Sequence, residues 1–121
     1  MQDWQNKLSE EIQNGRKAQE NGKDGLARVC ARRAAGWAIR ESLKAENVSL
    51  NNPSAFEYIK YLSAQTNNSV EVQKALKHLK LRVEKDAHDE DSYWPLPEVD
   101  LIDEAKWLIK ELLDFTILPT S

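Results

Sequence analysis

The stretch from Gly25 to Leu43, GLARVCARRAAGWAIRESL, constrains the fold more than any other part of the chain. At 3.6 residues per turn, its apolar residues cover about half of the helix circumference, which is wider than the stripe that a surface helix needs. Many of them are alanines, which let neighbouring helices approach closely. The apolar residues are Leu26, Ala27, Cys30, Ala31, Ala34, Ala35, Trp37 and Ala38. The pattern predicts a helix at the centre of a bundle.

Four further segments have helical periodicity, and no segment has the alternation of a strand. The predicted helices run over about 3–20, 24–46, 53–64, 69–85 and 101–115. Because short turns join most of them, we predict one all-α domain, an antiparallel up-and-down bundle of four or five helices. Its predicted parts are a peripheral N-terminal helix with a thin apolar stripe (1–22), a core bundle (23–115) and a tail (116–121).

Four polar residues have the positions of helix N-caps. Asp24 precedes the arginine-rich helix, and Asn52 precedes a proline at the first helical position. Asn68 and Glu71 have the spacing of a capping box. Asp100 precedes the last helix, whose apolar stripe is the cleanest in the chain.

Composition is that of a globular domain: 121 residues, of which 40% are hydrophobic and 31% charged. No apolar run approaches the roughly 18 residues of a membrane span, and the N-terminus lacks the pattern of a secretion signal. The single cysteine, Cys30, excludes an internal disulfide framework and lies on the apolar arc of its helix. We therefore expect a cytoplasmic protein in which Cys30 is a small core residue and not a nucleophile.

The net charge of −3 is unevenly distributed along the chain. Residues 16–44 carry a local charge of +5, and residues 82–104 carry a local charge of −7. One interpretation is that the two regions neutralise each other across the fold. The other is a basic surface available to a polyanion.

Arg82 and His88, within RVEKDAH, are the candidate catalytic residues, and His78 lies four residues before Arg82 on the same helix face. A guanidinium can hold a phosphate with two hydrogen bonds, and an imidazole moves a proton near neutral pH, so the pair suits phosphodiester chemistry. The alternative is a solvated helix end with an ordinary histidine. Acidic neighbours of His88 favour this alternative because they repel a phosphate backbone. They are Asp86, Asp89, Glu90 and Asp91.

The same acidic run offers oxygen ligands for a hard metal ion but matches no metal motif. It lacks the glycine of a calcium loop and the closing glutamate. One histidine and one distant cysteine do not make a zinc site. The four glycines are scattered and form no phosphate-binding loop. We therefore predict no metal and no other cofactor.

Four arginines of the 24–46 helix divide into two pairs. Arg33 and Arg40 lie near the apolar arc, and we predict that they line a groove and hold a phosphate or carboxylate. Arg28 and Arg32 have the spacing of neighbours on one face, and we expect them to be surface charges paired with acids of the 82–104 region. Arg33, Arg40 and His78 are therefore the candidate ligand-binding residues.

Two tryptophans are candidate interface residues. Trp107 lies on the polar side of the last helix, and an exposed tryptophan indicates a contact surface. The alternative places Trp107 under the Tyr93-Trp94-Pro95 loop. Trp4 belongs to the sparse stripe of the first helix. Together they indicate self-association as a two-fold dimer.

Three segments together resemble the HEPN family, the higher eukaryotes and prokaryotes nucleotide-binding domains. They are ARVCARRAAGWAIRESL, NNPSAFEYIKYL and RVEKDAH. The resemblance spans about Asp24 to Leu113 and implies a bundle of four or five helices, often dimeric. It also implies one of two functions: a metal-independent endoribonuclease of toxin–antitoxin and defence systems, or a non-catalytic nucleotide- or protein-binding module. A nucleotidyltransferase-type antitoxin is the kind of protein partner that it suggests.

Arg82 and His88 would occupy the two fixed places of the family's nuclease motif. Val83 stands where that motif usually has a polar residue, and acids crowd His88. We therefore predict a binding or regulatory module for a nucleotide, RNA or protein, without catalysis and without membrane contact. The alternatives are an endoribonuclease acting through Arg82 and His88, and a structural subunit that joins a larger assembly through Trp107 and the basic helix.

Overall fold

The computed structural model describes residues 2–48, 50, 54–81, 96 and 98–117. Five α-helices and no strands lie in these residues, so the predicted all-α bundle is confirmed. The helices are α1 (Asp3–Glu20), α2 (Asp24–Lys44), α3 (Ala55–Ser63), α4 (Val70–Lys80) and α5 (Leu101–Leu113). Within the described ranges, no helix combines the length and the apolar character needed to cross a membrane.

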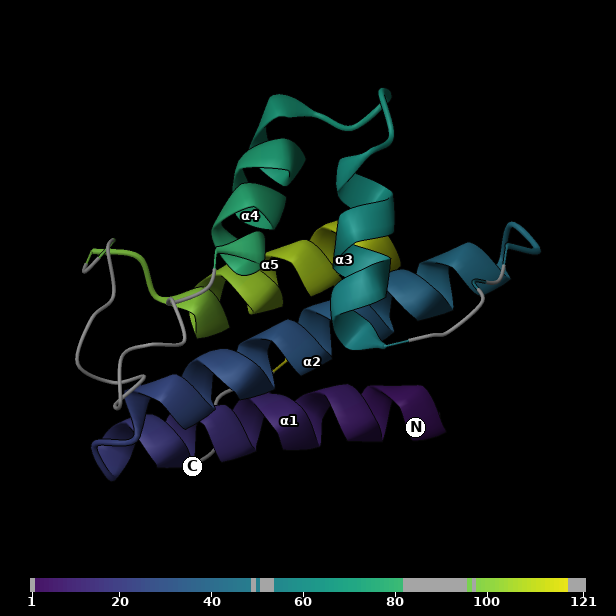
Figure 1. The fold of residues 1–121 in the computed structure, drawn as a ribbon. Coiled ribbons are helices and arrows are strands. Elements are labelled where there is room, and N and C mark those ends of the chain that lie inside the picture. The colour runs from purple at the N-terminus through teal and green to yellow at the C-terminus, as the bar shows by residue number, and fades with distance from the viewer. Residues whose placement is uncertain (1, 49, 51–53, 82–95, 97, 118–121) are drawn as a thin grey trace.

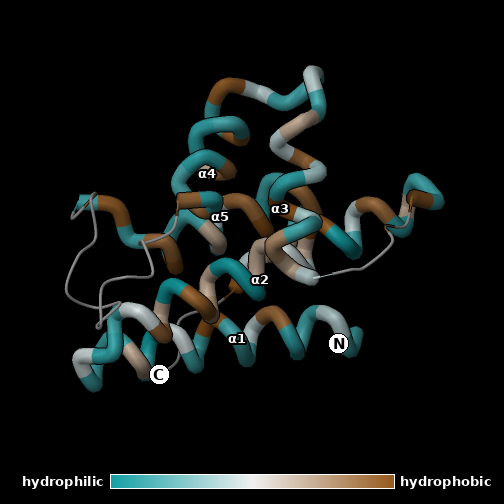
Figure 2. Tube along the Cα trace, viewed as in Figure 1, coloured by the Kyte–Doolittle hydropathy of each residue, from teal (hydrophilic) through white to brown (hydrophobic). Residues whose placement is uncertain are grey.

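The helix α2 is central, as predicted, since it packs against α1, α3 and α5. The helices α1 and α2 run antiparallel, while α3 and α4 form a second antiparallel hairpin that rises steeply from α2 (Figure 1). Figure 2 shows hydrophilic residues over most of α1, in agreement with its thin apolar stripe. That stripe still buries Leu8 and Ile12 against the core, so α1 is an outer helix firmly packed on α2.

Small residues of α2 bring its neighbours close. Its alanines at five positions of the predicted arc are at most 2% exposed: Ala27, Ala31, Ala34, Ala35 and Ala38. At Gly36, an added Cβ would overlap the backbone of Ala55, so the first turn of α3 rests directly on α2. Leu26 corrects the prediction, because it is 48% exposed. It lies in the first turn of α2, at the edge of the packed region.

The N-cap of α5 is the predicted one. The Asp100 carboxylate accepts hydrogen bonds from the backbone N–H groups of Ile102 (2.8 Å) and Asp103 (3.2 Å). Beyond α5, Ile117 is only 4% exposed, so the core includes part of the predicted tail. The N-cap predicted at Asn52 is wrong by two residues, because α3 begins at Ala55 and the Ser54 hydroxyl accepts from the backbone N–H of Glu57 at 3.2 Å.

Two other predicted N-caps are wrong by one residue. Lys23 occupies the cap position of α2, and Asp24 is the first helical residue, where its charge favours the positive end of the helix dipole. Ser69 caps α4, and Asn68 instead donates its side-chain amide to the Leu62 carbonyl at 2.7 Å. Adjacent asparagine and serine residues are both good caps, and the bond to Leu62 decides between them.

Candidate functional site

The predicted catalytic pair is not placed by the structure. Arg82 and His88 lie outside the described residues, as do the acidic run 86–91 and the Tyr93-Trp94-Pro95 loop. The catalytic assignment and the alternative position of Trp107 under that loop therefore stay predictions. The candidate ligand-binding residues Arg33, Arg40 and His78 are all described.

Two of these three candidates are held by carboxylates. His78 of α4 donates from Nδ1 to Oε1 of Glu104 on α5, and its side chain is 14% exposed. Nη1 of Arg33 lies 4.0 Å from Oε1 of Glu11 on α1, and the Arg33 side chain is 54% exposed. Both contacts join neighbouring helices, so these residues stabilise the packing and do not converge on one ligand.

The arginines expected at the surface face the protein itself. Arg28 is buried, with 9% exposure, which corrects its assignment as a surface charge. Arg32 donates from Nε to the Leu79 carbonyl at 3.1 Å and from a terminal nitrogen to the Leu81 carbonyl at 2.6 Å. These carbonyls end α4, where a cation offsets the negative end of the helix dipole. Arg32 therefore fastens α4 to α2.

Arg40 differs from the other candidates because it lines a cleft. The cleft has a volume of about 230 Å³ and lies between the N-terminal half of α1 and the C-terminal half of α2. Arg40 and Trp37 line it from α2, and Trp4 and Lys7 line it from α1. The predicted ligand-binding arginine and the predicted interface tryptophan Trp4 therefore meet in one site.

The two tryptophan rings of this cleft are anchored by other aromatic rings. Trp4 makes an edge-to-face contact with Phe115, with ring centroids 5.6 Å apart. Trp37 makes a similar contact with Tyr58 at 6.1 Å. The Arg40 guanidinium lies over the Trp37 ring, 5.1 Å from its centroid. The edge-to-face contacts restrain both rings, and Arg40 covers one face of Trp37.

The charge of the cleft is positive on balance. Neither Lys7 nor Arg40 has a carboxylate within 4.0 Å among the described residues, whereas Lys44, Lys60 and Lys110 each have one and Arg16 has two. Glu41 also lines the cleft, and its carboxylate accepts from Lys44 at 3.0 Å. The two unpaired cations can therefore receive an anion.

Sequence reasoning missed Lys7 and Trp37 as parts of this site. Trp4 and Lys7 are three residues apart, as are Trp37 and Arg40, so each pair lies on one helix face. Two tryptophan–cation pairs at this spacing on consecutive helices were the available signal. The α1–α2 hairpin brings the two faces together, because α1 begins beside the end of α2.

No protein-family model, curated protein or solved structure matches this chain. The relationship to the HEPN family therefore stays a prediction.

Proposed function

We propose that this chain is a small HEPN-like helical module that binds a nucleotide or single-stranded RNA in the α1–α2 cleft without cutting it. The observation that carries the proposal is the meeting of Trp4 and Trp37 with Lys7 and Arg40 around one hollow of about 230 Å³. Aromatic rings stack on nucleobases, and cations at their edge receive the phosphate. The hollow has room for one nucleobase, whose phosphate would lie outside it and contact Lys7 and Arg40.

Stacking and charge make separate contributions that experiments can resolve. Stacking of a base on an aromatic ring stabilises binding by about 1–3 kcal/mol. The phosphate contact depends on salt, because binding releases counterions from a polyanion. We expect adenosine 5′-monophosphate to bind more tightly than adenosine, and adenosine to bind more tightly than inorganic phosphate.

The test is a calorimetric titration of the full chain with these three ligands and with a short adenine oligoribonucleotide. Trp4→Leu retains an apolar contact with Phe115 but removes the stacking surface, so we expect about tenfold weaker binding of the monophosphate. Trp107→Leu is the matched control, since it removes an exposed tryptophan from α5. Its affinity should equal that of the wild type.

A second pair of variants tests the phosphate contact. Arg40→Gln removes a cation of the cleft, and Arg33→Gln removes the same charge from the same helix outside it. We expect only Arg40→Gln to weaken binding of the monophosphate and to reduce its dependence on salt. Absence of binding by the wild type, or equal loss in both members of either pair, would disprove the proposal.

The alternative function is a metal-independent endoribonuclease that acts through Arg82 and His88. We expect no cleavage, because Val83 and the acids around His88 make a poor phosphate site. Incubation of labelled RNA with the protein in a metal chelator tests this expectation. Cleavage that disappears in both Arg82→Ala and His88→Ala would establish the nuclease instead.

A further inference from the structure

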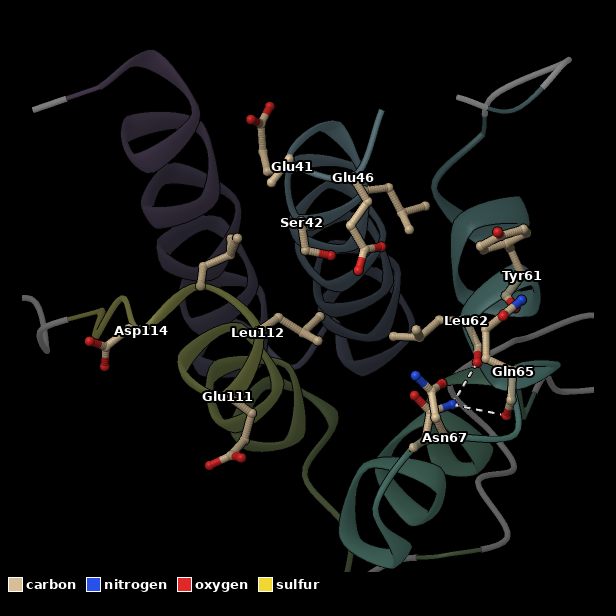
Figure 3. A pocket seen from close by; sticks show the side chains of 14 residues that line it. Glu41, Ser42, Glu46, Tyr61, Leu62, Gln65, Asn67, Glu111, Leu112 and Asp114 are labelled. Atoms are coloured by element: carbon tan, nitrogen blue, oxygen red, sulfur yellow. Dashed lines mark hydrogen bonds between the residues drawn. The ribbon is translucent and has the colours of Figure 1, made fainter. Parts of the chain in front are cut away.

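A second cavity, of about 730 Å³, opens where the C-terminal ends of α2, α3 and α5 meet. Figure 3 shows Leu62 of α3 and Leu112 of α5 on opposite sides of it, pointing toward each other. Both leucines are half-buried, so the cavity has an apolar floor between them. A hollow of this size is in the range of small-molecule sites.

The charged side chains that line this cavity are all acidic. Glu41 is bonded to Lys44, and Asp114 is bonded to Lys110. The other two, Glu46 and Glu111, are exposed and have no cation within 4.0 Å among the described residues. In Figure 3 the Glu46 carboxylate points into the cavity, whereas the Glu111 side chain points away from the space between the two leucines.

The ends of three helices border the cavity. The cavity is lined by residues at or just beyond the C-termini of α2, α3 and α5. Terminal carbonyls of α3 are already bonded there, since the Leu62 carbonyl accepts from the Asn68 side chain at 2.7 Å and the Tyr61 carbonyl accepts from the Gln65 side chain at 3.3 Å. Tyr61, Gln65 and Asn67 supply further polar groups on the α3 side. The cavity therefore complements a ligand that combines cationic donors with an apolar part.

We infer that this cavity binds a linear aliphatic polyamine. The methylene chain would pack between Leu62 and Leu112. The ammonium groups, which are donors only, would bind the Glu46 carboxylate and the Glu111 carboxylate, the latter after rotation of its exposed side chain toward the cavity. A simple metal ion has no apolar part to match the leucines. A basic helix would need an elongated groove, whereas this cavity is bordered by the ends of three helices. The site is distinct from the nucleotide cleft and shares only Glu41 with it.

The first experiment compares two ligands of equal charge on the wild-type chain. Spermidine and hexaamminecobalt(III) both carry three positive charges, but only spermidine has a methylene chain. The titration is done by calorimetry in about 150 mM NaCl. This salt suppresses long-range electrostatic attraction between ligand and protein, because the screening length is then about 8 Å. We expect one spermidine per chain and at least tenfold weaker binding of the cobalt complex. No spermidine binding, or equal affinity for both ligands, would overturn the inference.

The second experiment compares two double variants with the same net charge. Glu46→Gln with Glu111→Gln removes the two unpaired carboxylates of the cavity, and we expect about tenfold weaker spermidine binding. Glu10→Gln with Glu20→Gln removes two exposed carboxylates of α1 and should leave the affinity unchanged. All four residues are exposed, so circular dichroism should show the same helix content in each protein. Equal weakening in both variants would mean general charge attraction and would overturn the inference.

Discussion

Arg16 of α1 and Asp100, the N-cap of α5, lie 3.0 Å apart although 84 positions separate them in the sequence. The same Asp100 carboxylate accepts a hydrogen bond from the side-chain amide of Gln19 at 3.1 Å. One side chain therefore caps α5 and fastens it to the end of α1. The pair also links the basic and acidic regions of the chain, which agrees with the interpretation that these regions neutralise each other.

Asp100 is expected to make stability depend on pH. Partial burial raises the pKa of Asp100, but hydrogen bonds from Gln19 and the Asp103 backbone, with the charge of Arg16, outweigh burial and hold that pKa below its usual value. A carboxyl with a lowered pKa in the folded state stabilises the protein above its unfolded value of about 3.9. This stabilisation is lost as the pH falls through the folded pKa.

Two substitutions distinguish the contribution of the Asp100 N-cap hydrogen bonds from the contribution of its negative charge. Asp100→Ala removes both and should cost about 1–2 kcal/mol of unfolding free energy at neutral pH. Asp100→Asn keeps a good cap, so it should cost less than Asp100→Ala, but it lacks the charge contribution that the wild type has at neutral pH and loses in acid. Urea unfolding from about pH 7 to pH 2 measures both effects. If Asp100→Asn has the same acid dependence as the wild type, the assignment is wrong.

Gly36 is expected to tolerate no side chain. An added Cβ there would overlap the Ala55 backbone, which cannot rotate away, so Gly36→Ala should destabilise the fold by about 1–3 kcal/mol despite the higher helix propensity of alanine. Gly15 is the matched control in α1. Its added Cβ would lie 2.7 Å from Cδ1 of Ile102, the flexible end of a side chain. The melting temperature of Gly36→Ala should be well below that of Gly15→Ala. The reverse order would contradict the packing of α3 on α2.

Cys30 is expected to be unreactive in the folded protein. Burial first, and then the negative charge of Glu11, raise the pKa of the thiol, although Arg33 opposes this shift. Because the thiolate is the reactive form and Cys30 is only 3% exposed, a disulfide reagent should label it only after unfolding. The test is the labelling rate at about pH 8 with and without denaturant. Rapid labelling of the native chain would refute the assignment of Cys30 as a core residue.

Periodic patterns predicted the five helices of the described residues, but the predicted end of the fourth helix, near residue 85, is wrong, because α4 ends at Lys80 and Leu81 is extended. The predicted span of α1 agrees with Asp3–Glu20, because its end is marked by Asn21 and Gly22, whose φ of 73° a glycine adopts readily. The central position of α2 followed from the width of its apolar arc. The steep position of the α3–α4 hairpin was not predictable in this way. It depends on the contact of Gly36 with Ala55, and a one-dimensional pattern contains no such pairing.

The candidate site was predictable only in pieces. Arg40 and Trp4 were both named from the sequence, but as a ligand-binding residue and an interface residue. Their meeting depends on how α1 lies along α2, which periodicity does not determine. His78 shows the opposite case. It was predicted to bind a ligand, but its imidazole is hydrogen-bonded to Glu104, which lies 26 positions further along the chain.

Trp107 is expected to lie in a two-fold dimer interface. It is 36% exposed on α5, whereas Trp4, the other interface candidate, packs on Phe115 and lines the cleft. A tryptophan at the centre of an interface contributes about 2 kcal/mol or more, so Trp107→Ala should weaken dimerisation by about 30-fold. Val70→Ala is the control, since Val70 is an exposed hydrophobic residue on α4, with 81% exposure. Light scattering over a concentration series gives the dimer constant, and a wild-type chain that stays monomeric at concentrations on the order of tens of micromolar would exclude this dimer.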